Sequence, residues 1–135
     1  MNKFDRRGFL AGTAGAAGLV MLGGLGAPAR AAGPLNVGVL IPGSKSDKGW
    51  MESGYDGMKA AEKALGSKVS VKFIENVKFG DMEQVLVALA GKNDLVIGVG
   101  GQTQASVFKV APRFPKVKFA IVGGNADPKK PDNVS

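Results

Sequence analysis

Residues 94–101, DLVIGVGG, carry the pattern that decides the fold. Apolar residues fill the centre of this run without polar alternation, and the glycine pair at its end breaks the pattern. A short run of this kind is typical of a strand that is covered on both faces, as in a parallel sheet. We therefore expect a buried strand over residues 94–99, followed by a tight strand-to-helix turn.

Further runs of residues predict three more strands. Residues 35–41 (LNVGVLI) are largely apolar and end at Pro42–Gly43, and residues 117–122 (VKFAIV) end at a second glycine pair. In residues 69–74 (VSVKFI) polar residues alternate with apolar ones, which indicates that one face is more exposed. All of these runs are short and are bounded by turn residues or by segments of different periodicity.

Helical patterns fill the segments between the predicted strands. Over residues 50–65 apolar residues recur every three or four positions, and we expect Gly66 to end this helix. We expect Asp81 to begin a second helix as the capping residue of a capping box. A third helix is expected over residues 103–114, and Pro112 is expected to shorten it near its end.

The order of these elements, βαβαβαβ, predicts an α/β fold. Right-handed crossovers convert this order into a doubly wound parallel sheet with helices on both faces. Ligands of such sheets bind at the carboxyl ends of the strands, near the switch in strand order. The loops expected at that edge comprise residues 42–49, 75–80, 99–103 and 123–127.

Residues 1–31 have the three parts of an export signal. A basic stretch, residues 1–7, precedes an uncharged apolar stretch, residues 8–26, and Ala29-Arg30-Ala31 forms an A-x-A cleavage pattern. The basic stretch ends in an arginine pair and is followed by Gly8-Phe9-Leu10, which is similar to the twin-arginine signal. We therefore expect a Tat-type signal peptide that the Tat translocase recognises, with a transmembrane helix as the alternative.

The composition excludes several classes of function. The chain has 135 residues, a formal net charge of +7, and neither cysteine nor histidine. Its basic residues are scattered, so nucleic acid is not an expected partner, and its glycine-rich turns lack the spacing of nucleotide-phosphate loops. The absence of cysteine and histidine excludes disulfides, common nucleophiles and most zinc sites, so we expect no catalytic set, metal or cofactor. We expect a periplasmic protein that is not a lipoprotein, because a lipid anchor needs a cysteine.

The first loop of the expected ligand edge holds the side chains best suited to binding. Asp47 can accept hydrogen bonds, and Trp50, the only tryptophan, offers a flat apolar face for stacking. We therefore expect a site for a small polar ring compound. Its candidate residues are Ser44, Asp47, Trp50, Gly101, Gln102 and Asn125. The alternatives are structural: Asp47 as a helix cap, Trp50 as a core residue, and helix-start or turn roles for the two amides.

Several segments, taken in order, resemble one family of binding proteins. They are VGVLIPGSKSDKGW (37–50), GMKAAEKALG (57–66), DLVIGVGGQ (94–102), VAPRFPKVKFAIV (110–122) and DNVS (132–135). Together they resemble the basic membrane protein (BMP) family of ABC transporter substrate-binding proteins, which is related to bacterial purine nucleoside receptors. The resemblance implies a two-lobed fold of the periplasmic-binding-protein type I that closes on a nucleoside, purine or related small molecule. It also implies an ABC permease of the inner membrane as a partner.

The resemblance also bears on individual residues and on the domain organisation. Asp47 and Trp50 match an aspartate and an aromatic residue in the family's first loop, whereas Met51 stands where asparagine is usual. Complete members have a second lobe of similar size. We therefore expect residues 32–135 to be the N-terminal lobe alone, with the second lobe absent because the sequence is a fragment or the gene is truncated. A ligand sensor of the same fold and a small doubly wound enzyme are the alternative functions.

Overall fold

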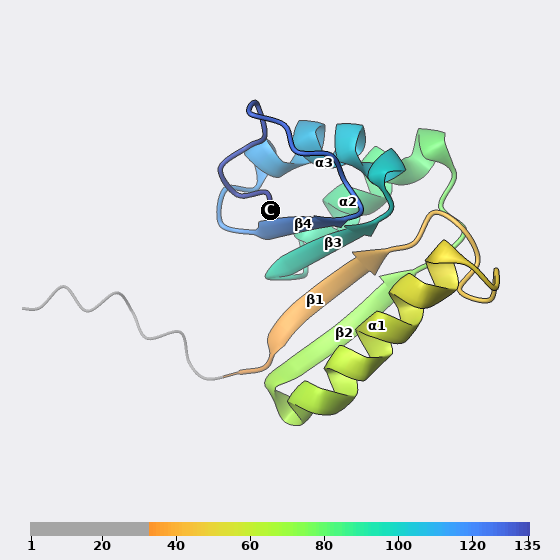
Figure 1. Cartoon of the computed structure of the whole chain (residues 1–135). Coiled ribbons are helices and arrows are strands. Elements are labelled where there is room, and N and C mark those ends of the chain that lie inside the picture. The colour runs from red at the N-terminus through yellow and green to blue at the C-terminus, as the bar shows by residue number, and fades with distance from the viewer. Residues whose placement is uncertain (1–32) are drawn as a thin grey trace, which may run out of the picture. The chain divides into compact units, whose positions relative to one another are not determined.

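The computed structural model describes residues 33–135, and its centre is a parallel sheet of four strands (Figure 1). The strands are β1 (Leu35–Leu40), β2 (Val69–Ile74), β3 (Leu95–Val99) and β4 (Lys118–Val122). Their order is β2-β1-β3-β4, and each neighbouring pair runs parallel. Because the chain moves from β1 out to β2 and then back past β1 to β3, the strand order switches between β1 and β3. The expected signal peptide, residues 1–31, lies outside the described residues.

Helices connect the strands and cover both faces of the sheet (Figure 1). Helix α1 (Trp50–Leu65) follows β1, α2 (Met82–Ala90) follows β2, and α3 (Gln104–Val110) follows β3. Helix α1 lies on one face, whereas α2 and α3 lie on the other. The predicted doubly wound α/β fold is therefore confirmed. Among residues 33–135, none of the helices combines the length and apolar character that a membrane span requires.

The helix boundaries follow the local chemistry, with two differences from the prediction. Helix α1 has the predicted bounds and ends at Gly66. The capping-box prediction is wrong, because a 3-10 turn over Phe79–Asp81 leads into α2 and the Asp81 side chain makes no capping hydrogen bond. The third helix is shorter than predicted and passes into a 3-10 turn at Ala111–Arg113. Pro112 explains this change, because it lacks the N–H that would continue the α-helical hydrogen bonds.

The face covered by α2 and α3 contains the main hydrophobic core. Strands β1, β3 and β4 and both helices contribute to it, and α2 also packs against α3. Side chains that are at most 1% exposed in this core include Leu40, Leu86, Val96, Val107 and Phe119. The centre of this face, over β1, β3 and β4, is therefore well packed.

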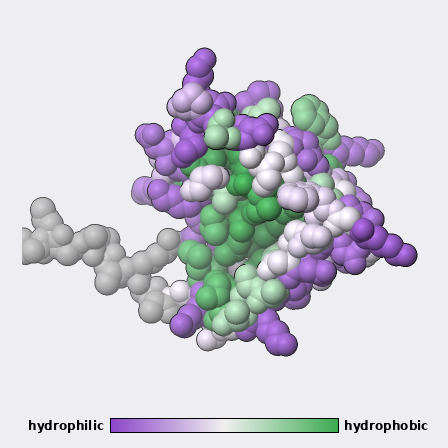
Figure 2. Space-filling model, in the orientation of Figure 1, coloured by the Kyte–Doolittle hydropathy of each residue, from purple (hydrophilic) through white to green (hydrophobic). Residues whose placement is uncertain are grey.

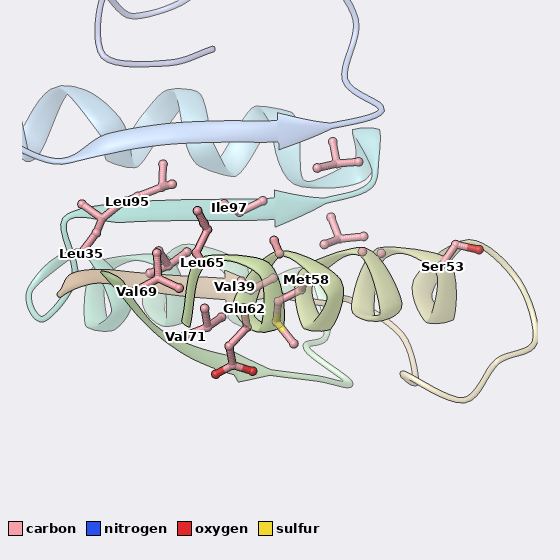
Figure 3. A pocket seen from close by; sticks show the side chains of 16 residues that line it. Leu35, Val39, Ser53, Met58, Glu62, Leu65, Val69, Val71, Leu95 and Ile97 are labelled. Atoms are coloured by element: carbon pink, nitrogen blue, oxygen red, sulfur yellow. The ribbon is translucent and has the colours of Figure 1, made fainter. Parts of the chain in front are cut away.

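The face covered by α1 is packed less completely. Val37, Val39 and Val99 are buried there, but α1 itself contributes no buried residue. An apolar groove of about 380 Å³ remains along α1 and is lined by residues from all four strands. Figure 3 shows these side chains gathered beside α1, with Met58 and Leu65 contributed by the helix. In the space-filling view of Figure 2, apolar side chains lie open at the centre of the molecule.

The groove corrects the prediction for β3. The uninterrupted apolar run predicted a strand covered on both faces, and Val96 is indeed fully buried in the main core. Leu95 and Ile97, however, line the groove and are only partly buried. Coverage of β3 on the α1 face is incomplete because α1 packs mainly beside β2, at the far side of the sheet.

The last residues extend the sheet beyond β4. Val134 forms a parallel bridge with Phe119 and is buried. The Asn133 side chain holds this segment in place, because its Nδ2 donates to three backbone carbonyl groups of residues 111–117 at 2.9–3.1 Å. Residues 133–135 therefore pair with β4 along its outer edge.

Candidate functional site

The carboxyl edge of the sheet brings together the loops that the sequence predicts there. Because all four strands run parallel, the segments that follow them emerge on the same side of the sheet. The loop after β1, residues 42–49, is called the first loop below. It contains Ser44 and Asp47 and leads directly into Trp50 at the start of α1.

The carboxylate of Asp47 caps the start of α1. It accepts hydrogen bonds from the backbone N–H groups of Gly49, Met51 and Glu52 at 2.8, 3.3 and 3.0 Å. These bonds, with that from Glu52 the strongest cause, lower the pKa of Asp47 below its ordinary value. Asp47 therefore has the helix-cap role that the sequence left open, and a ligand would use the carboxylate's remaining lone pairs.

Ser44 also acts within the first loop. Its Oγ accepts a hydrogen bond from the backbone N–H of Ser46 at 3.1 Å, and the residue is partly buried. The loop is further tied to the segment after β2, since the N–H of Asn76 donates to the carbonyl oxygen of Gly43 at 2.9 Å. These contacts give the first loop a defined shape without any ligand.

Trp50 begins α1 and reaches across to the turn after β4. It is 55% exposed, so it is not a core residue. A Cβ atom built on Gly123 would lie 2.6 Å from Cζ2 of Trp50, which shows that the indole rests directly on the Gly123 backbone. Gly123 also has a φ of +78°, which residues with a side chain rarely adopt. Glycine at position 123 thus provides the surface on which the tryptophan lies.

Gly101 meets the same turn from the end of β3. A Cβ atom on Gly101 would lie 2.9 Å from the carbonyl oxygen of Gly123, so the two turns are in close contact. Gln102 follows in a 3-10 turn and is exposed, with its side-chain amide folded back against Gly100. The structure therefore brings Trp50 and Gly101 together at Gly123, with Gln102 directly beside them.

Asn125 lies next to this cluster but faces a different surface. Its backbone N–H donates to Oε1 of Gln104 at 2.7 Å, which fixes the turn after β4 to the start of α3. Asn125 also lines a hollow of about 250 Å³ together with Phe108 of α3. Neither this hollow nor the groove along α1 includes Asp47 or Trp50, so these two residues belong to an open edge.

Three residues organise this edge although the sequence pattern did not predict them as site residues. Glu75 binds the first loop, Gln104 fixes the turn after β4, and Gly123 supports Trp50. Glu75 and Gly123 directly follow a predicted strand, so their place in the strand order was the available signal. Gln104 carried no comparable signal, because the predicted helix around it explains a polar residue equally well.

Comparison with known proteins defines the class to which this fold and edge belong. A family model described as "ABC transporter substrate-binding protein PnrA-like" matches residues 35–135. The chain therefore belongs to the PnrA-like family of ABC transporter substrate-binding proteins, and the predicted resemblance is confirmed.

Individual relatives agree with this assignment. The chain is 37% identical over 114 residues to a purine-binding protein of Brucella abortus (strain 2308), and the match covers 82% of this chain and 31% of the relative. A solved ABC transporter solute-binding protein from Aeropyrum pernix K1 is 35% identical, with a TM-score of 0.66 over 75% of this chain and 27% of that one. A second, from Conexibacter woesei DSM 14684, is 24% identical, with a TM-score of 0.63 over 74% of this chain and 33% of that one, and supports the fold. The chain thus spans about a third of the length of these relatives.

Proposed function

We propose that this chain is the N-terminal lobe of an exported substrate-binding protein that delivers a small polar ring compound to an ABC importer. The observation that carries the proposal is Trp50, which is 55% exposed and rests on Gly123 at the carboxyl edge of the sheet. A held, exposed indole offers a stacking surface where doubly wound sheets bind ligands. The purine-binding relative supports a purine, a nucleoside or a related ring as the ligand class.

The open carboxyl edge supports a cleft between two lobes. Phe79 follows β2 and Val122 is the last residue of β4, so both belong to the carboxyl edge of the sheet. Phe79 is 69% exposed and Val122 is 44% exposed. An edge that combines exposed apolar side chains with polar groups is suited to being covered by another body. We infer that a second lobe, formed by the part of the longer relatives that this chain does not cover, closes over this edge by a hinge motion and buries the ligand.

The candidate residues have separate roles in this proposal. Trp50 stacks on the ring, and Asp47 accepts hydrogen bonds from it while also holding the start of α1. The wall is completed by Ser44, Gly101, Gln102 and Asn125. Met51 has a supporting role, because a Cβ atom on Gly43 would lie 3.0 Å from Cγ of Met51. Its thioether packs under the first loop, so we expect no hydrogen bond to the ligand from this position.

The proposed route and partners follow from the N-terminus and the family. Residues 1–31 direct the protein to the Tat translocase, which exports folded proteins, and are then removed. The mature protein works in the periplasm without a lipid anchor and presents its closed form to an ABC permease.

The test is the affinity for purines and nucleosides of the full-length protein, which here means this lobe together with the inferred second lobe. Mass spectrometry of the purified protein should detect a retained ring compound, and titration calorimetry with adenosine, guanosine and hypoxanthine should identify the class. Stacking on an aromatic side chain contributes about 1–3 kcal/mol per base, so Trp50→Ala should weaken binding by roughly 5- to 150-fold.

Leu65→Ala is the matched control for Trp50→Ala. Leu65 is also an exposed apolar residue of α1, but it lies at the opposite end of the helix. This variant should bind as the unsubstituted protein does. Equal affinity of Trp50→Ala and Leu65→Ala for the retained compound would show that Trp50 does not stack on the ligand.

A further inference from the structure

Glu75 joins the end of β2 to the first loop through a single carboxylate. Its Oε2 accepts a hydrogen bond from the backbone N–H of Lys45 at 2.9 Å. Its Oε1 lies 2.9 Å from Nζ of the same lysine. One carboxylate therefore binds both the backbone and the side chain of Lys45, so it fixes the direction of the loop as well as its position.

The surroundings of this pair restrict its movement. The Lys45 ammonium group lies 5.8 Å from the ring centre of Tyr55 and 5.2 Å from that of Phe73. The two rings pack edge to face, with their centres 5.1 Å apart. Because Tyr55 belongs to α1 and Phe73 to β2, the lysine is held between the helix and the strand as well as by Glu75.

The protonation behaviour of both groups agrees with this geometry. The hydrogen bond and charge of Glu75 raise the pKa of Lys45. The backbone and side-chain hydrogen bonds from Lys45 lower the pKa of Glu75. Both residues therefore remain charged at neutral pH, and their side chains are only 38% and 25% exposed.

The other ion pairs of the helices differ from this one in what they join. Lys59 and Glu62 lie one turn apart on α1, and Lys109 and Glu83 join the exposed surfaces of α3 and α2. The Lys45–Glu75 pair instead joins the first loop to the end of β2. The same loop leads along the chain from Lys45 into Trp50. The pair therefore lies where it can control the proposed stacking surface.

We propose that Glu75 is a positioning residue, which holds the first loop so that Trp50 is fixed over Gly123 before a ligand arrives. This proposal deepens the proposed function and rests on it for its effect on affinity. The first loop is anchored at one end to β2 by Glu75, and beyond its other end Trp50 contacts the turn after β4. Ordering a mobile side chain on binding costs about 0.5–1.5 kcal/mol, and a loop that is already ordered avoids this cost.

The first measurement needs no ligand and uses this chain of 135 residues, in which Trp50 is the only tryptophan and so the only source of the indole signal. In Glu75→Ala we expect acrylamide quenching of Trp50 to increase and its fluorescence anisotropy to fall. Glu75→Gln keeps an acceptor for the Lys45 N–H and should restore part of the anisotropy. Far-UV circular dichroism should show that both variants are folded.

Glu83→Ala is the matched control, because it also removes a carboxylate that pairs with a lysine. It should leave the Trp50 signal unchanged. Unchanged quenching and anisotropy in Glu75→Ala would overturn the proposal, whatever the ligand affinity proves to be.

The second measurement is the affinity of the full-length protein for adenosine. Glu75→Ala should bind about 3–10 times more weakly, which corresponds to the cost of ordering the loop, and Glu83→Ala should bind normally. Normal adenosine affinity in a Glu75→Ala protein with altered Trp50 fluorescence would also overturn the proposal. If the unsubstituted protein binds no purine or nucleoside, the proposed function fails, while the fluorescence of Trp50 still decides whether Glu75 positions the loop.

Discussion

The two faces of the sheet use similar apolar strand residues but are covered very differently. Helix α2 has 9 residues and buries four of them, whereas α1 has 16 residues and buries none. Helices α2 and α3 bury a continuous core over β1, β3 and β4, but α1 alone leaves an open groove of about 380 Å³. In this sheet, apolar strand residues indicate which face can be buried, and the helices that pack on that face decide how much of it is buried.

The largest expected effect compares the same substitution on the two faces. Leu86→Ala removes a fully buried side chain from α2, and such a change typically lowers the free energy of unfolding by about 2–5 kcal/mol. Leu65→Ala removes a side chain of α1 that is 47% exposed, so the loss should be about 1 kcal/mol or less. Urea unfolding of both variants measures the difference. Equal losses would mean that α1 is packed as tightly as α2.

A smaller effect, opposite in sign on the two faces, is expected from Gly→Ala substitutions. A Cβ atom on Gly38 would lie 2.7 Å from Nδ2 of Asn93 and 3.0 Å from Cδ2 of Leu89, so Gly38→Ala should destabilise by about 1–3 kcal/mol. A Cβ atom on Gly57 of α1 would meet nothing within 4 Å, so Gly57→Ala should stabilise by about 0.5–1 kcal/mol. The same unfolding measurement applies. Destabilisation by Gly57→Ala would contradict an open groove along α1.

The smallest expected effect concerns how α1 is held at its start. Because α1 has no buried side chain, the hydrogen bonds to Asp47 should contribute noticeably to its stability. The pKa of Asp47 is lower in the folded protein than its ordinary value of 3.8, so this stabilisation is complete above that value and disappears as the pH falls through the lowered pKa. Asp47→Asn should therefore lower the melting temperature by a few degrees at pH 7.

Thermal unfolding between pH 7 and pH 2 checks the sign of this effect. The difference between Asp47→Asn and the unsubstituted protein should shrink as Asp47 becomes protonated at low pH. A difference that grows toward low pH would show that the Asp47 carboxylate is not stabilised by the helix start.

Much of the fold could be predicted from the sequence because its signals are local. The bounds of α1 follow from helical spacing and from Gly66, and β3 follows from a continuous apolar run. The capping-box prediction failed because the spacing of Asp81 and a later polar residue fits a 3-10 entry to the helix equally well. The groove could not be predicted, since the sequence of β3 does not show that α1 packs mainly against β2 and leaves β3 partly uncovered.

The sequence predicts where the candidate site residues lie in the fold, but it does not predict the contacts between them. The strand order identifies the carboxyl edge, and with it Asp47 and Trp50. The contacts that organise the edge join residues far apart in the chain, such as Lys45 with Glu75 and Trp50 with Gly123. A glycine in a turn or a glutamate after a strand has many ordinary explanations, so only the three-dimensional structure shows what each one contacts.

The pairing of the last residues with β4 has a consequence for self-association. An unpaired strand at the side of a sheet offers its N–H and C=O groups to another protein molecule, which is a common route to aggregation. Beside β4 these groups are occupied by residues 133–135. On the opposite side, β2 presents the exposed Lys72, and a charge on an outer strand disfavours the addition of a further strand. Strand β4 itself is thus unavailable to another molecule where residues 133–135 pair with it, and charge disfavours the addition of a strand beside β2.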